Sequence, residues 1–276
     1  MKKITFLLLL FCLGFGLMAQ ENSIPKVAIG VRAGLNGSSI LVNKNTLSFD
    51  KGYSSTQKLK LGAQAGFTVN FRFKEKWTFQ TGLIYAWQRT GQEQSSKFVK
   101  ELSSYSIGST NAYTSHHLRL PVMINYHINT SPNHLIIGLG LYADGTLGGT
   151  LAYDASAIVT TATEQGTEIN NFFASGELHP YKNERHRLYY TENKDDFVKT
   201  YDLYTGQMLK RFDIGLNLEI GYQISQFYVG IGGNIGLLNM ARKEFFGNQF
   251  AERNFSLQLN FGYTIKIGRA VQQECR

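Results

Sequence analysis

The sequence predicts an all-β protein: an eight-stranded antiparallel up-and-down transmembrane β-barrel with short periplasmic turns and long extracellular loops. Eight segments alternate apolar and polar residues, their connections alternate long and short, and an apolar leader begins the chain. In an up-and-down sheet, successive connections lie at opposite ends. Bacterial outer-membrane barrels have short turns at the periplasmic end and longer loops outside.

The eight candidate strands follow one another from residue 27 onward. They are expected at 27–35, 59–73, 77–89, 115–128, 134–147, 211–224, 227–239 and 254–267. The connections between them are 36–58, 74–76, 90–114, 129–133, 148–210, 225–226 and 240–253. Every odd connection is long and every even one is a tight turn, which predicts three turns inside and four loops outside.

Each candidate strand divides into two faces, because successive side chains of a strand point to opposite sides. The segment 77–89 has one face of Trp77, Phe79, Thr81, Leu83, Tyr85 and Trp87 and another of Thr78, Gln80, Gly82, Ile84, Ala86 and Gln88. The segments 59–73, 211–224 and 254–267 repeat this division into an apolar and a polar face.

Glycines and aromatic residues indicate which face is inside. The polar face carries the glycines Gly62, Gly66, Gly82, Gly138, Gly140, Gly215, Gly221, Gly230, Gly232 and Gly262. Glycine weakens an exposed strand, but inside a narrow barrel it makes room for larger neighbours. Large aromatics of the apolar face lie near strand ends, as in the aromatic girdles of membrane barrels. The alternative, a soluble ligand-binding barrel, would turn the apolar face inward.

A polar lumen would contain a network of charged side chains. Its expected members are Arg32, Lys60, Arg72, Arg119, Asp144, Asp213, Glu219 and Lys266. Eight strands enclose a space that side chains fill, and buried charges are tolerated when they are paired and hydrogen-bonded. We therefore expect a paired plug, with an ion path as the alternative.

The N-terminal segment predicts that the protein is exported. Lys2 and Lys3 precede an apolar run, and Ala19 offers a cleavage site, so residues 1–19 are expected to be a signal peptide and 20–276 the barrel domain of an outer-membrane protein. Cleavage would leave Cys275 without a partner cysteine, and neither a disulfide nor a metal or other cofactor is expected. The net charge of +8 suits anionic lipid surfaces, whereas export argues against nucleic acid as a partner.

Several strings along the mature chain form an ordered set. The fourth candidate strand reads Leu118-Arg119-Leu120-Pro121-Val122, and its mid-strand proline predicts a bulge. Other strands contain strings such as Gly30-Val31-Arg32-Ala33-Gly34 and Leu257-Gln258-Leu259-Asn260-Phe261. In sequence and order these strings resemble the small outer-membrane β-barrel family of Bacteroidetes that is often called PorT-like. The resemblance implies this fold, an outer-membrane location and a link to protein secretion. One departure is that the last strand ends at Ile267 and is followed by a tail.

One pair of histidines offers a rival, enzymatic interpretation. His116 and His117 stand at the start of the fourth strand, near Ser103, Ser104, Ser106, Ser109 and Ser115. Some small outer-membrane barrels modify lipid A with a histidine and a serine or acidic group at the outer rim. Only one of two consecutive strand residues can face the lumen. A metal site at His179 and His186 has no accompanying ligand pattern. The non-enzymatic interpretation of His116 and His117 is that they belong to a polar rim of the barrel.

The connection 148–210 is the longest in the chain. Connections of such length are usually functional or disordered. Its second half mixes cations with tyrosines, and the candidates for contact with a protein partner are Tyr181, Arg185, Arg187, Tyr189 and Tyr190. We therefore predict a monomeric, non-enzymatic structural or interaction protein that lies in outer-membrane lipid and binds its partner through 148–210.

Overall fold

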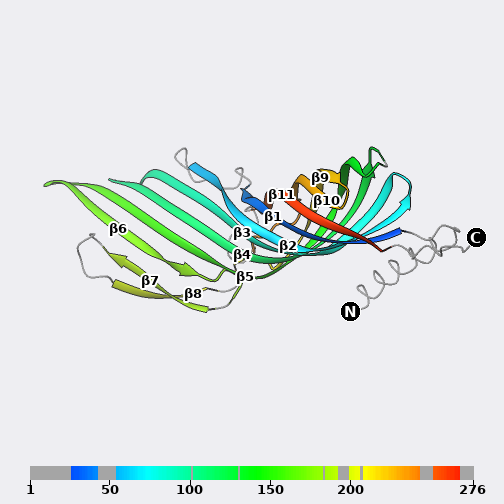
Figure 1. The fold of residues 1–276 in the computed structure, drawn as a ribbon. Coiled ribbons are helices and arrows are strands. Elements are labelled where there is room, and N and C mark those ends of the chain that lie inside the picture. The colour runs from blue at the N-terminus through cyan, green and yellow to red at the C-terminus, as the bar shows by residue number, and fades with distance from the viewer. Residues whose placement is uncertain are drawn as a thin grey trace, which may run out of the picture.

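Eight strands of the chain join into a closed antiparallel ring. The computed structural model describes residues 26–42, 54–100, 102–129, 131–182, 184–191, 199–205, 208–242 and 251–267. The strands in these ranges are β1 (Lys26–Val42), β2 (Ser54–Lys74), β3 (Trp77–Lys100), β4 (Ser103–His127), β5 (Asn133–Thr163), β6 (Gly166–Leu178), β7 (Glu184–Thr191), β8 (Lys199–Thr205), β9 (Phe212–Ile224), β10 (Phe227–Gly236) and β11 (Glu252–Ile267). Pairing runs β1–β2–β3–β4–β5–β9–β10–β11 and returns to β1 (Figure 1).

The ring confirms the predicted eight-stranded up-and-down barrel and its three tight turns. Two of these turns, at 75–76 and 225–226, have two residues each, and the third joins β4 to β5. Ser225 adopts a left-handed conformation with φ 54°. Its amide donates to the Pro132 carbonyl at 3.0 Å and to Asn133 Oδ1 at 3.1 Å. Two neighbouring turns are thereby joined at the same end of the barrel.

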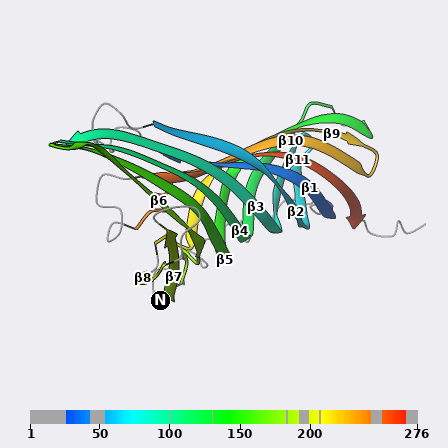
Figure 2. The same ribbon diagram turned by 90° about the vertical axis from the view of Figure 1, so that its left-hand side faces the viewer.

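The long connections contain more strand than predicted. β3 and β4 continue as a ladder to the pair Lys100–Ser103, and β5 continues to Thr163. β6 pairs with the outer part of β5, and β7 pairs with β6 and β8. The expected loops 90–114 and 148–210 are therefore largely strands. We call the outer part of β3, β4 and β5 (residues 90–100, 103–114 and 148–163), together with β6, the extension; Figures 1 and 2 show it projecting past the ring.

Burial decides which face of the barrel is inside. Outward apolar residues are exposed, among them Leu139 at 60% and Ile231 at 63%. Inward polar residues are buried, including Asn36, Gln64, Thr68, Gln80, Gln88, Asn125, Asn217, Asn234 and Asn260. A soluble barrel would have the opposite arrangement, so the alternative of a soluble ligand-binding barrel is contradicted. An apolar outer band around a polar interior is the pattern of outer-membrane barrels.

The bulge in the fourth barrel strand lies at another place than predicted. β3 pairs Thr81 with Val122 and Ile84 with Arg119, so the register is the same on both sides of Pro121. The ladder skips the proline, which has no N–H to donate. The register shift lies instead on the β5 side, where Leu147 is an extra residue opposite His116 and His117. The prediction of a bulge at Pro121 was therefore wrong.

Glycines of the inner face make room for two tyrosines. A side chain at Gly221 or Gly230 would collide with the ring of Tyr228, and one at Gly215 would collide with Tyr142. Tyr228 and Tyr142 are 5% and 2% exposed. The glycines were expected to make room for Arg, Gln and Asn side chains. In the structure they also make room for the rings of Tyr142 and Tyr228. Within the described residues, there is no helix long and apolar enough to cross a membrane.

Candidate functional site

The first charged cluster of the lumen joins β1 to β9. Arg32 Nη1 donates to both carboxylate oxygens of Glu219, at 2.6 and 2.8 Å, and Arg32 Nη2 donates to Gln80 Oε1 at 3.1 Å. The guanidinium lies 4.4 Å from the centre of the Tyr228 ring, whose hydroxyl donates to Glu219 at 2.6 Å. Arg32 is thus held by a carboxylate, an amide and an aromatic face.

The second charged cluster lies between β4, β5 and β9. Arg119 donates to Asp144 Oδ2 from Nη2 at 2.7 Å and from Nε at 3.1 Å, and lies 4.7 Å from the centre of the Tyr142 ring. The Tyr142 hydroxyl donates to Asp213 at 3.1 Å. Side chains from three strands therefore occupy the lumen at this level.

Two further members of the expected network, Lys60 and Arg72, are separate from these clusters. Lys60 and Arg72 are half-buried on the inner face of β2 and form no ion pair with any described residue. The side chain of Lys266 lies outside the described part of the structure. Five of the eight expected residues thus lie in the two clusters, with Asp213 bound by hydrogen bonds from Tyr142 and Asn254 rather than by a cation.

Chain segments 179–182, 208–211 and 239–242, which we call the lid, pack together at the long-connection end. The Pro180 carbonyl accepts from the amides of Met208 and Leu209 at 2.9 and 3.0 Å, and Lys210 N donates to Met240 O at 2.8 Å. Leu209, Met240 and Ala241 are buried. An apolar layer thus lies above the polar lumen, an arrangement that suits a filled barrel better than an ion path.

Tyr181 belongs to the lid and is not an exposed partner contact as expected from the sequence. It is 7% exposed, and its carbonyl accepts from Arg211 at 2.8 Å. Burial, and then the nearby Glu252 carboxylate, raise the pKa of the Tyr181 hydroxyl. Burial also raises the pKa of Glu252, at the outer end of β11, to about 7. Tyr181 is buried because the turn after β6 folds back over the long-connection end of the barrel.

The two consecutive histidines of β4 point to opposite faces, as predicted. His117 is 3% exposed in the lumen, with Nδ1 3.0 Å from Asp144 Oδ1 and Nε2 2.7 Å from Ser115 Oγ. Thr146 Oγ1 is 3.3 Å from the same Nδ1. Ser115, His117 and Asp144 are therefore connected in the order that nucleophilic serine chemistry uses. The sequence held one signal for this, a serine two residues before a histidine on one strand face.

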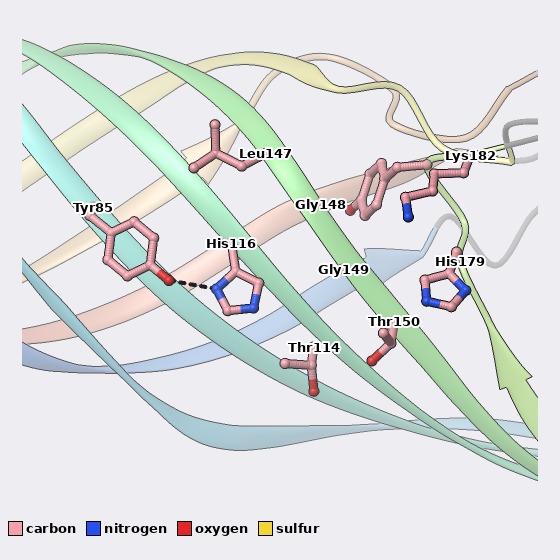
Figure 3. A pocket seen from close by; sticks show the side chains of 10 residues that line it. Tyr85, Thr114, His116, Leu147, Gly148, Gly149, Thr150, His179 and Lys182 are labelled. Atoms are coloured by element: carbon pink, nitrogen blue, oxygen red, sulfur yellow. Dashed lines mark hydrogen bonds between the residues drawn. The ribbon is translucent and has the colours of Figure 1, made fainter.

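His116 lies on the outer face and lines a hollow of about 390 Å³ at the barrel rim. Its Nδ1 is 2.6 Å from the Tyr85 hydroxyl, and the two rings are stacked with centres 6.0 Å apart (Figure 3). The other residues of the lining are Thr114, Leu147, Gly148, Gly149, Thr150, His179, Tyr181 and Lys182. The sequence did not indicate this hollow, because residues far apart in the chain form it.

The other candidate contacts lie on β7. Arg185, Arg187, Tyr189 and Tyr190 belong to this strand, but their side chains, like that of His186, lie outside the described part of the structure. The expected signal peptide and the tail after Ile267 also lie outside it. Where side chains are described, no three His, Cys, Asp or Glu residues gather as metal ligands.

Comparison with known proteins agrees with a barrel that has an apolar outer face and a polar interior. Residues 18–242 match the family described as outer membrane protein beta-barrel domain. The chain belongs to this family. No curated protein matches the sequence.

Solved structures with a similar arrangement include two outer-membrane proteins. Ail, the attachment invasion locus protein of Yersinia pestis, is 13% identical over 87% of this chain and 99% of its own, with a TM-score of 0.31. OprG from Pseudomonas aeruginosa is 12% identical over 87% of this chain and 97% of its own, with a TM-score of 0.27.

Proposed function

We propose that this family member is a non-enzymatic outer-membrane protein that holds its extension outside the cell as a docking surface for a protein partner. The observation that carries the proposal is that β3, β4 and β5 continue as one hydrogen-bonded sheet well beyond the membrane-spanning ring. A barrel needs only about 9–11 residues per strand to cross a bilayer, whereas β5 has 31 residues. The excess length has no use in membrane insertion.

One face of the extension supports protein contact. Ile107 pairs with Ala157, which pairs with Phe172, so the three side chains form one row across β4, β5 and β6. Ile107 and Phe172 are 39% and 37% exposed. Aromatic and apolar side chains of this kind form the centres of protein interfaces. The cations and tyrosines of β7 remain proposed contacts beside this row.

A crosslinking pull-down from intact membranes tests the docking surface. Replacing Ile107 and Phe172 by Asp should abolish recovery of the partner, because charges would occupy the proposed apolar contact. The matched control replaces Ser106 and Asn171 by Asp, in the same strands but on the opposite face. Heat-dependent gel mobility of each variant reports whether the barrel is folded. Unchanged recovery with a folded Ile107/Phe172 variant would contradict the proposal.

The resemblance to PorT-like proteins adds a finer part to this proposal. Its namesake is linked to a protein-secretion system, and we extend that link to this chain. If the link is right, the partner recovered in the pull-down belongs to a secretion apparatus, and deletion of the gene lowers export of secreted proteins. A deletion strain with normal export would limit the proposal to surface binding, without a role in secretion.

A second candidate function rests on the connected Ser115, His117 and Asp144. In an ester hydrolase, His117 Nε2 would take the Ser115 proton as Oγ attacks the ester carbonyl, and the protonated imidazole would then return a proton to the departing alcohol. Water would hydrolyse the acyl-serine and release the fatty acid. Mass spectrometry of lipid A distinguishes the candidates. A deacylase predicts extra acyl chains in a strain with Ser115→Ala but not in one with Ser109→Ala, a matched change farther out on the same strand; identical lipid A in both strains contradicts this candidate.

A further inference from the structure

The hollow beside His116 lies at the outer boundary of the lipid-facing band. On β4 the outward apolar residues run from Tyr126 through Ile124 and Leu120 to Leu118, and His116 is the next outward residue. Residues 118–126 match the roughly 9–11 positions that a transmembrane strand needs. His116 therefore stands at the level of lipid headgroups, as does its hydrogen-bonded neighbour Tyr85 on β3.

The lining of the hollow is suited to an anion. It contains the Lys182 ammonium and the imidazoles of His116 and His179, with hydroxyls from Tyr85, Thr114 and Thr150. None of the ten described residues that line it is acidic. Lysine is a common ligand of phosphate groups, and charge-assisted hydrogen bonds to phosphate are about twice as strong as neutral ones.

The contact between Tyr85 and His116 prepares the imidazole as a donor. When the Tyr85 hydroxyl donates to Nδ1, the neutral ring carries its proton on Nε2, on the side away from Tyr85. The protonated ring has a donor there as well. Figure 3 shows His116 between Tyr85 and the part of β5 that carries Gly149 and Thr150. The ring can therefore donate a hydrogen bond in either protonation state.

The shape of the hollow favours a ligand with both a headgroup and acyl chains. Gly148 has open space where a side chain would start. Leu147, turned outward by the bulge, is 57% exposed, and Tyr85 is 43% exposed. A free anion gains nothing from these apolar surfaces, whereas a lipid could place its phosphate among the cations and its chains along Leu147 and the band below.

We propose that the hollow formed by Tyr85, His116, Gly148, His179 and Lys182 binds the phosphate group of an outer-leaflet glycolipid. This site is on the outer face of β4 and β5. It differs from the row of Ile107 and Phe172 and from the luminal Ser115 and His117, so it can be tested separately from both candidate functions.

Native mass spectrometry of the full-length barrel in maltoside micelles tests the site, with diphosphoryl lipid A as the probe. Wild type should retain one lipid, and the double variant His116→Gln, Lys182→Gln should bind it about tenfold or more weakly, since it loses charged hydrogen bonds to phosphate. Gly148→Leu should have a similar effect by filling the space while leaving every charge in place.

Two matched variants serve as controls. Lys76→Gln removes an exposed cation from the opposite end of the barrel, and Gly108→Leu adds the same side chain farther out along β4; both should bind as wild type does. Equal retention by wild type and the double variant overturns the site. Equal retention of lipid A without phosphates reduces it to an acyl contact, and displacement of lipid A by inorganic phosphate at the same concentration makes it a free-anion site. Both of these results contradict the proposal.

Discussion

The membrane-spanning ring and the extension are built from the same strands but are stabilised differently. In the ring, apolar side chains face lipid, and buried ion pairs fill the interior. In the extension, both faces of the sheet are largely accessible to water, and much of the order comes from backbone pairing between neighbouring strands. Strand geometry therefore continues from one region to the other, while the energetics of side chains change at the membrane surface.

The largest expected difference between the two regions is in ion pairs. Replacing Arg119 by Met leaves the Asp144 carboxylate buried without its strongest partner and should lower the free energy of unfolding by about 3–5 kcal/mol. The exposed pair of Lys58 and Glu93 lies just outside the ring, and Lys58→Met should cost less than about 1 kcal/mol. Urea unfolding in lipid vesicles measures both. Equal losses would contradict the distinction between the regions.

The next largest difference is expected when a charge is placed on the outward face of the ring and of the extension. Leu139 faces lipid near the middle of the membrane-spanning part of β5, and Leu139→Lys should destabilise the barrel by about 2–4 kcal/mol. Ile158 lies on the outward face of the same strand in the extension and is 45% exposed. Ile158→Lys should change the unfolding free energy by about 0.5 kcal/mol or less. A large loss from Ile158→Lys would show that the extension also lies against lipid or protein.

A smaller and more local effect is expected at the lid, on the boundary between the regions. Burial raises the pKa of Glu252 to about 7, above the value of about 4.3 in an unfolded chain. The folded state therefore holds this proton more tightly, and its contribution to lid stability is complete below about pH 4 and is lost as pH rises toward 7.

Hydrogen exchange of the Met240 amide, which donates to the Glu252 carbonyl, measures this pH dependence. After correction for the intrinsic pH dependence of exchange, protection should fall between pH 5 and pH 7.5 in wild type and stay constant in Glu252→Gln. A fall of the same size in Glu252→Gln would assign the pH dependence to another group.

The sequence predicted the ring well because lipid imposes a period of two. Wherever one face meets lipid and the other the lumen, as in 77–89 and 211–224, alternation marks both the strand and its faces. The outer parts of β3, β4 and β5 meet water on both sides, so Ser, Thr and Ala occur on either face and the pattern that defines a strand disappears. These strands were therefore expected to be loops.

The sequence indicated which face of the strands carries the luminal charges, but not which of these charges pair with one another. Arg32 and Glu219 were expected inside because each lies on a polar face, yet they are 187 residues apart, and only the closure of the ring brings them together. Tyr142 and Tyr228 were missed as luminal residues, because their fit depends on glycines of neighbouring strands, whose register the sequence does not contain. Tyr181 was wrongly assigned to the surface, since a reversal of the chain after β6 buries it.

The extra residue Leu147 reverses the meaning of odd and even positions along β5. Between the short-turn end and Leu147, even-numbered residues such as Tyr142 and Asp144 point inward. Between Leu147 and the outer end of β5, the odd-numbered Leu151 is the buried one. A sequence grafted onto this barrel above Leu147 must therefore be written in the opposite phase from one grafted below it. Deleting this one residue would remove the bulge yet leave the outer half of β5 on its present faces, because Gly148 would then follow the inward Thr146 in regular alternation and still pair with His116.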